Sequence, residues 1–154
     1  MNRRIKGHVI MNLSDEKVVI NSALSGIAQI PPDVVRRLGE ARVYDLLSAA
    51  AAEAILLRFA SLPSPEETLQ FVSQLHGRFP ELTPVIRPLA TEGVIRTAFG
   101  ETGLIDGIQP MYLRGLLFVL PYAIATQLDF SSQERAAFVE RVLHANDSAP
   151  VGAV

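Results

Sequence analysis

The sequence contains no cysteine and no tryptophan. Without cysteine the chain can form no disulfide, no thiolate zinc site and no iron–sulfur cluster, and it has no cysteine nucleophile. Charge is also scarce, because Asp, Glu, Lys and Arg make up 19% of the residues, against an average of about 25%. The 16 acidic residues slightly outnumber the 14 basic ones. This balance argues against an intrinsically disordered chain and against broad contact with nucleic-acid phosphates, so we expect no nucleic-acid partner.

Long apolar runs are missing as well. The basic start, Met1–Lys6, is followed by Gly7 and His8 rather than by an apolar segment, so we expect no signal peptide and a cytoplasmic protein. The most apolar stretch, residues 110–128, contains Arg114 and Pro121. We therefore predict a buried helix there, suited to an oligomer contact, and no membrane association.

The N-terminal quarter carries patterns typical of strands. Two segments rich in β-branched residues, 8–12 and 17–21, flank the polar residues 13–16 and predict a hairpin. A turn at Ser25-Gly26 and a third strand at Ile27–Ile30 would complete a meander, followed by a short helix that ends at Gly39. We therefore predict an α+β fold in which a small three-stranded antiparallel sheet packs on a mainly helical body.

Residues 40–148 carry helical signals. Apolar residues recur at three- and four-residue intervals over residues 40–62, and two Ser-x-x-Glu capping boxes begin at Ser64 and Ser131. Glycine and proline interrupt residues 81–109, for which we make no assignment. The length predicts one domain over residues 1–148, with residues 1–39 forming the meander and short helix, and a frayed tail over residues 149–154.

No recognisable catalytic motif occurs along the chain. The Glu140 and His144 pair is spaced i, i+4, but nothing beside it completes a set of metal ligands, and no G-x-S-x-G elbow occurs. We therefore expect no metal, no cofactor and no enzymatic activity. The alternative is an enzyme whose site assembles in space from residues such as His76, Glu92, Asp106 and Arg114.

The N-terminal segment also resembles a known family. Residues 9–12 and 17–30, with the small-residue–Leu–Ser–Gly turn within Asn21–Gly26, resemble the leading hairpin of SPASM-type radical SAM peptide maturases and are similar to PqqD-like leader-peptide recognition domains. The likeness covers about 30 residues, and the lack of cysteine excludes radical SAM chemistry. It implies an accessory protein of ribosomal-peptide (RiPP) biosynthesis that handles substrate without a catalytic part.

These observations favour a non-enzymatic protein that binds a peptide or protein partner. An extended segment of the partner would add a strand along a sheet edge. The candidate binding residues are Val18, Ile20, Asn21, Ile27, Gln29, Arg36 and Arg37. The alternative is a homo-oligomeric structural or interaction protein, which the positive mean hydropathy of +0.26 favours. The two hypotheses are compatible, and we expect a homodimer in either case.

Overall fold

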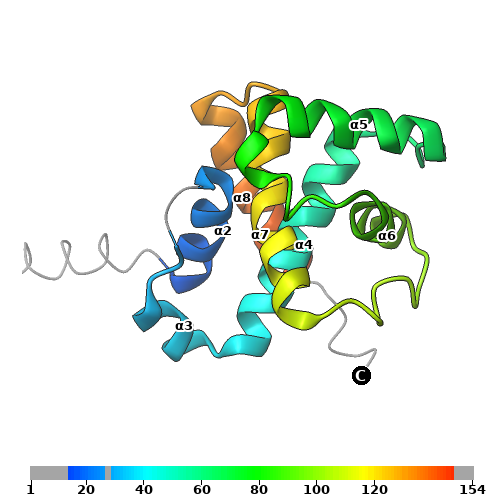
Figure 1. Cartoon of the computed structure of the whole chain (residues 1–154). Coiled ribbons are helices and arrows are strands. Elements are labelled where there is room, and N and C mark those ends of the chain that lie inside the picture. Colours follow the sequence, from blue (N-terminus) through cyan, green and yellow to red (C-terminus); the bar gives the residue numbers. More distant parts are fainter. Residues whose placement is uncertain (1–13, 27–28, 148–154) are drawn as a thin grey trace, which may run out of the picture.

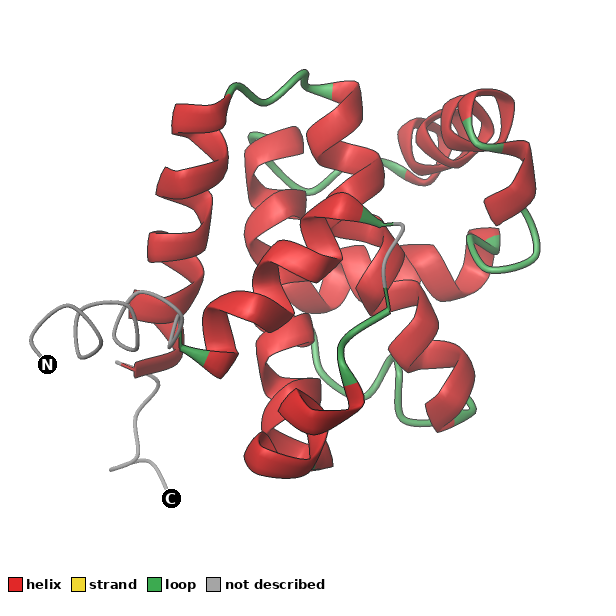
Figure 2. Ribbon diagram, turned by 90° about the vertical axis from the view of Figure 1, so that its left-hand side faces the viewer, coloured by secondary structure: helices red, strands yellow, loops and turns green. Residues whose placement is uncertain are grey.

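The computed structural model describes residues 14–26 and 29–147. Over these residues the chain forms helices joined by loops, and no strand occurs among them (Figure 1, Figure 2). In chain order the elements are α2 (Asp15–Ser25), α3 (Pro32–Leu38), α4 (Glu40–Arg58), α5 (Pro65–Arg78), the 3-10 helix η1 (Pro80–Leu82), α6 (Pro88–Ala98), α7 (Pro110–Gln127) and α8 (Ser132–Asp147). The prediction of an α+β fold is therefore wrong, because the described part is a helical bundle.

The correction falls on the segment predicted as the second strand. Residues 17–21 lie in α2, and the polar residues before them start this helix instead of forming a hairpin turn. The Ser14 side chain accepts a hydrogen bond from the Lys17 amide at 3.2 Å, and two acidic residues occupy the first turn. Gly26 ends the helix in the left-handed conformation. Local caps thus outweigh the strand preference of the Val-Val-Ile run.

The other two predicted strands give no sheet either. Residues 8–12 lie outside the described residues, as does Ile27. Gln29 and Ile30 are in a loop that leads into α3. The tail over residues 149–154 also lies outside the described residues. The strands implied by the resemblance to peptide maturases are therefore absent from the segment 14–26.

The helices predicted from periodicity and caps are confirmed. At α5 the Glu67 amide donates to the Ser64 hydroxyl at 3.1 Å, and the Ser64 amide donates to the Glu67 carboxylate at 2.8 Å. Ser131 and Glu134 repeat the same exchange before α8. The backbone donor from Ser131 holds the pKa of the Glu134 carboxyl below its usual value.

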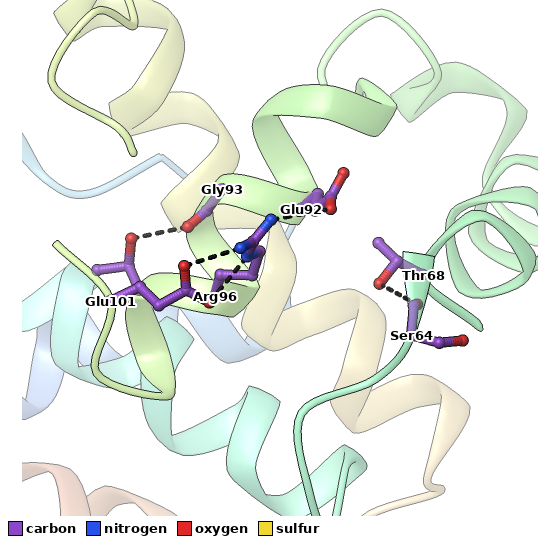
Figure 3. Close-up of polar contacts among 7 residues, drawn as sticks. Ser64, Thr68, Glu92, Gly93, Arg96 and Glu101 are labelled. Carbon is purple, nitrogen blue, oxygen red and sulfur yellow. Dashed lines mark hydrogen bonds and ion pairs between the residues drawn. The ribbon is translucent and has the colours of Figure 1, made fainter. Parts of the chain in front are cut away.

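The segment left without an assignment contains α6. Pro88 occupies the first position of this helix, where its missing N–H costs no hydrogen bond. At the other end, Arg96 donates two hydrogen bonds to Glu101 in the following loop, at 2.8 and 2.9 Å, and pairs with Glu92 on its own helix (Figure 3). Arg96 lowers the pKa of the Glu101 carboxyl. This ion pair fixes the loop after α6.

The core lies around α4 and α7, which pack extensively on each other at the centre of the molecule (Figure 1). α2 and α8 cover one side of this pair, and α6 packs on α4. Each of these five helices contributes fully buried side chains, among them Ile20, Leu46, Ile95, Leu116 and Phe138. Within the described ranges, no helix combines the length and apolar character needed to cross a membrane.

Candidate functional site

The residues predicted to bind a partner at a sheet edge do not form such an edge. Ile20 is fully buried, and Val18 is partly buried against the core, so neither is free to contact an added strand. Asn21 is exposed on α2, and Ile27 lies outside the described residues. Arg37 instead joins two helices by donating to both carboxylate oxygens of Asp15, at 2.8 and 2.9 Å. Within residues 14–26 and 29–147 there is therefore no sheet edge to which a partner could add a strand.

The four residues considered for an assembled catalytic site are not brought together by contacts. His76 Nε2 lies 2.5 Å from the backbone oxygen of Ile86. Glu92 faces Arg96 on its own helix (Figure 3). Arg114 has Glu40 as its nearest carboxylate, at 3.6 Å. Asp106 is exposed in the loop before α7. No hydrogen bond or ion pair between described residues connects any two of these four candidates.

Metal-ligating groups are dispersed in the same way. Glu140, the predicted neighbour of His144, pairs with Lys17 of α2 at 3.1 Å. Within residues 14–26 and 29–147, no group of three or more histidines or carboxylates is placed to hold a metal ion. One buried side-chain oxygen among these residues lacks a hydrogen-bond partner, Thr91 Oγ1 on α6, but this residue is fully buried and offers no access.

A groove of about 730 Å³ lies between the first turns of α6 and α7. We call it the α6–α7 groove. Its lining is mostly apolar and comes from Arg87, Pro88, Leu89, Ala90, Leu104, Ile108, Gln109 and Tyr112. Leu89 is 84% exposed and Leu104 is 41% exposed. Because the two exposed leucines belong to one continuous apolar lining, the groove is a candidate surface for a partner.

Arg87 and Tyr112, two of the polar residues that line the groove, contact each other. The Tyr112 hydroxyl donates to the Val85 carbonyl at 2.6 Å and accepts from the Arg87 amide at 3.3 Å. The Arg87 guanidinium lies over the Tyr112 ring, 4.5 Å from its centroid, and its Nε donates to the Pro84 carbonyl at 3.1 Å. Burial raises the pKa of the Tyr112 phenol, and Arg87 opposes that rise.

The charge of Arg87 is not neutralised within the described part of the chain. No carboxylate there forms an ion pair with it, whereas Arg36, Arg37, Arg96 and Arg141 each have at least one. α6 also begins without a side-chain cap. The positive end of its helix dipole therefore adds to the positive potential of Arg87. The groove therefore combines apolar walls with one positively charged side chain, Arg87, whose orientation is restrained by its contacts.

A second hollow, of about 560 Å³, lies between the segment that leads into α3, the first half of α4 and the first half of α7. We call it the α3–α4–α7 cavity. Gln29 and Arg36, two of the predicted binding residues, line it together with Arg114 from the enzyme hypothesis. It shares no lining residue with the α6–α7 groove, and the first turns of α7 contribute to both.

Sequence reasoning missed the α6–α7 groove because most of it comes from the segment that received no assignment. The signal present was Pro88 after Arg87, since proline favours the first position of a helix. The exposure of Leu89 depends on how α6 packs on α4, which no local pattern predicts. No family model matches the chain, and no match was found among curated proteins or solved structures.

Proposed function

We propose that this chain is a non-enzymatic protein that binds an apolar, acidic segment of a partner protein in the α6–α7 groove. The observation that carries the proposal is the 84% exposure of Leu89 beside Arg87, a cation without a carboxylate partner among the described residues. Leu89 and Leu104 are both exposed on this one groove, and a contiguous apolar patch with a polar residue beside it is typical of surfaces that bind another protein.

The charge selects the chemistry of the partner. Arg87 is restrained by its hydrogen bond to Pro84 and by the Tyr112 ring, so little side-chain entropy remains to be lost when it binds an anion. Arginine with an aromatic neighbour is a frequent centre of binding energy at protein interfaces. An amphipathic helix of the partner, with leucines on one face and a glutamate at its edge, matches both features.

Fluorescence anisotropy tests the proposal with a defined probe. The probe is a labelled amphipathic helical peptide of about 15 residues with leucines at i, i+4, i+7 and i+11 and flanking glutamates. A copy in which lysines replace the glutamates tests the charge. We expect a Kd of about 100 μM or lower for the acidic peptide and binding about tenfold weaker for the basic one.

Three variants distinguish the groove from the rest of the surface. Leu89→Asp should abolish binding, and Arg87→Glu should reverse the preference between the two peptides. Leu69→Asp is the matched control, because Leu69 is 57% exposed on α5 and does not line the groove. Binding of both peptides with equal affinity by all variants, or no binding at about 1 mM, would contradict the proposal.

The apolar groove could instead be covered by a second copy of the chain. Sedimentation velocity over a range of concentrations distinguishes a dimer from a monomer that binds another partner. If the chain dimerises at about 10 μM and Leu89→Asp makes it monomeric, the groove is a dimer interface and the proposed partner is wrong. A monomer that binds the acidic peptide supports the proposal.

A further inference from the structure

The α3–α4–α7 cavity has the properties of a small-molecule site. Its volume of about 560 Å³ is in the range that encloses ligands of drug size. Ile30, Val35, Leu47, Met111 and Phe118 supply apolar walls from three separate parts of the chain. This lining provides burial for a chain or ring but no hydrogen bonds, so any specificity has to come from the polar residues at the cavity.

Arg114 is ion-paired but not hydrogen-bonded. Its partner is Glu40, which also lines the cavity: the two side chains approach to 3.6 Å, which is longer than a hydrogen bond, and the Glu40 side chain is 72% exposed, so solvent screens the pair. Arg114 makes no hydrogen bond to any other described residue. A guanidinium presents five N–H donors in a fixed plane, and two of these bind a carboxylate side by side.

The other arginine at the cavity differs from Arg114. Arg36 is 72% exposed and is hydrogen-bonded to Asp33, one turn earlier on α3. The donors of Arg36 are therefore already engaged by a carboxylate, and its exposure lets solvent screen its charge. The side chain of Arg114 is only 37% exposed, so it is better shielded from water than Arg36.

We infer that the α3–α4–α7 cavity binds a carboxylate carried on an apolar group, with Arg114 as the anion-binding residue and the apolar walls covering the rest of the ligand. A medium-chain acid of about twelve heavy atoms fits the volume whole, and an apolar peptide would place its C-terminal end there. The same chemistry is supplied by a free medium-chain acid or by the C-terminus of an apolar peptide. This site is independent of the α6–α7 groove, which has a different lining.

Isothermal titration calorimetry on the full chain tests the inference with decanoate, decylamine and an N-acetylated trileucine in its acid and amide forms. Decanoate and the peptide acid carry the carboxylate. Decylamine has the same alkyl chain with a cationic ammonium group, and the peptide amide keeps the apolar side chains with an uncharged end. We expect at least one of the two acids to bind at least about tenfold more tightly than its uncharged or basic counterpart. Which acid binds distinguishes a free acid from a peptide terminus.

Substitutions at the two arginines locate the anion. Arg114→Leu should weaken binding of the acid by about tenfold or more, and Arg114→Lys should recover part of it, because lysine keeps the charge and loses the paired donors. Arg36→Leu is the matched control on the same cavity and should change the affinity by less than about threefold. Circular dichroism confirms that each variant is folded.

Three outcomes would overturn the inference. The first is that neither acid binds below its micelle or solubility limit. The second is that decylamine binds as tightly as decanoate, which would make the cavity a nonselective apolar surface. The third is that Arg114→Leu retains the affinity of the unmodified chain while Arg36→Leu loses it, which would place the anion on α3.

Discussion

Gly26 is the residue at which the backbone of α2 meets the side chains of α7. Its φ of +65° is left-handed, and a Cβ built on it would lie 2.2 Å from Cγ of the Tyr122 ring. Two separate effects therefore require glycine here: the backbone conformation, which other residues adopt at a cost, and the close approach of an aromatic ring. The ring in turn packs on Phe79, with centroids 5.4 Å apart.

We expect Gly26→Ala to lower the free energy of unfolding by about 2–4 kcal/mol, as the sum of the strained backbone and an overpacked contact. Urea unfolding measures the change. Gly39→Ala separates the two effects, because Gly39 has a φ of +90° but no neighbour within 4 Å of the added Cβ. It should cost about 1–2 kcal/mol, from strain alone.

Gly77→Ala is the opposite control, since Gly77 lies within α5 with open space around the added Cβ. It should stabilise the chain by about 0.5–1 kcal/mol, because alanine loses less conformational entropy in a helix. If Gly26→Ala and Gly39→Ala cost the same, the contact with Tyr122 contributes nothing and our account of this junction is wrong.

Residue type also explains why the sequence of residues 17–21 predicts a strand where the structure has a helix. Val18, Val19 and Ile20 favour strands because their β-branched side chains lose χ1 freedom in a helix. The buried residues of α2, however, are Val19, Ile20, Ala23 and Leu24, which recur with the period of a helix. This period and the Ser14 cap were both readable in the sequence. Residue type alone predicts a strand here, whereas the spacing of the buried residues predicts the helix that forms.

Elements with explicit start and stop signals could be predicted almost to their ends. α5 and α8 begin at Ser-x-x-Glu capping boxes, and α3 ends at Gly39. These signals are local, because each satisfies backbone groups within one turn. α6 carries only Pro88 at its start, and glycines follow its end, so its 11 residues gave too short a pattern for an assignment.

We expect Ser64→Ala to lower the free energy of unfolding by about 1 kcal/mol, because it removes the hydroxyl that accepts from the Glu67 amide. Thermal unfolding followed by circular dichroism measures the effect. Ser73→Ala is the matched control on the exposed side of the same helix and should stabilise the chain by up to about 0.5 kcal/mol through helix propensity. Equal effects of the two variants would show that the capping box does not stabilise α5.

At the scale of the whole molecule, the candidate site was beyond sequence reasoning. Gln29 and Arg36 were proposed for a sheet edge and Arg114 for catalysis, yet all three line one cavity. Their meeting results from the packing of α7 on α4, which brings together segments about eighty residues apart. Only tertiary contacts determine this placement. The sequence therefore identified these polar residues as candidates, but it could not show that they lie together.

Ion pairs tie α2 to three other helices, which makes the N-terminal part of the described chain sensitive to acid. Arg37 of α3 binds Asp15, Arg42 of α4 binds Glu16 at 2.7 Å, and Lys17 binds Glu140 of α8 at 3.1 Å. The hydrogen bonds from Arg37 hold the pKa of the Asp15 carboxyl below its usual value. A carboxyl with a lowered pKa in the folded state stabilises that state above its unfolded pKa and loses this contribution as the pH falls through the folded value.

The stabilisation from Asp15 should therefore be complete above about pH 5 and disappear as the pH falls through its lowered pKa, below the ordinary aspartate value of about 3.9. Carbon-detected NMR titration of the Asp15 carboxyl measures the midpoint directly. Arg37→Gln should raise this midpoint toward the ordinary value, because it removes the charged donor. Arg36→Gln is the matched neighbour, since Arg36 binds Asp33, and it should leave the Asp15 midpoint unchanged. A midpoint at the ordinary value in the unmodified chain would mean that α2 and α3 are not joined through this pair in solution.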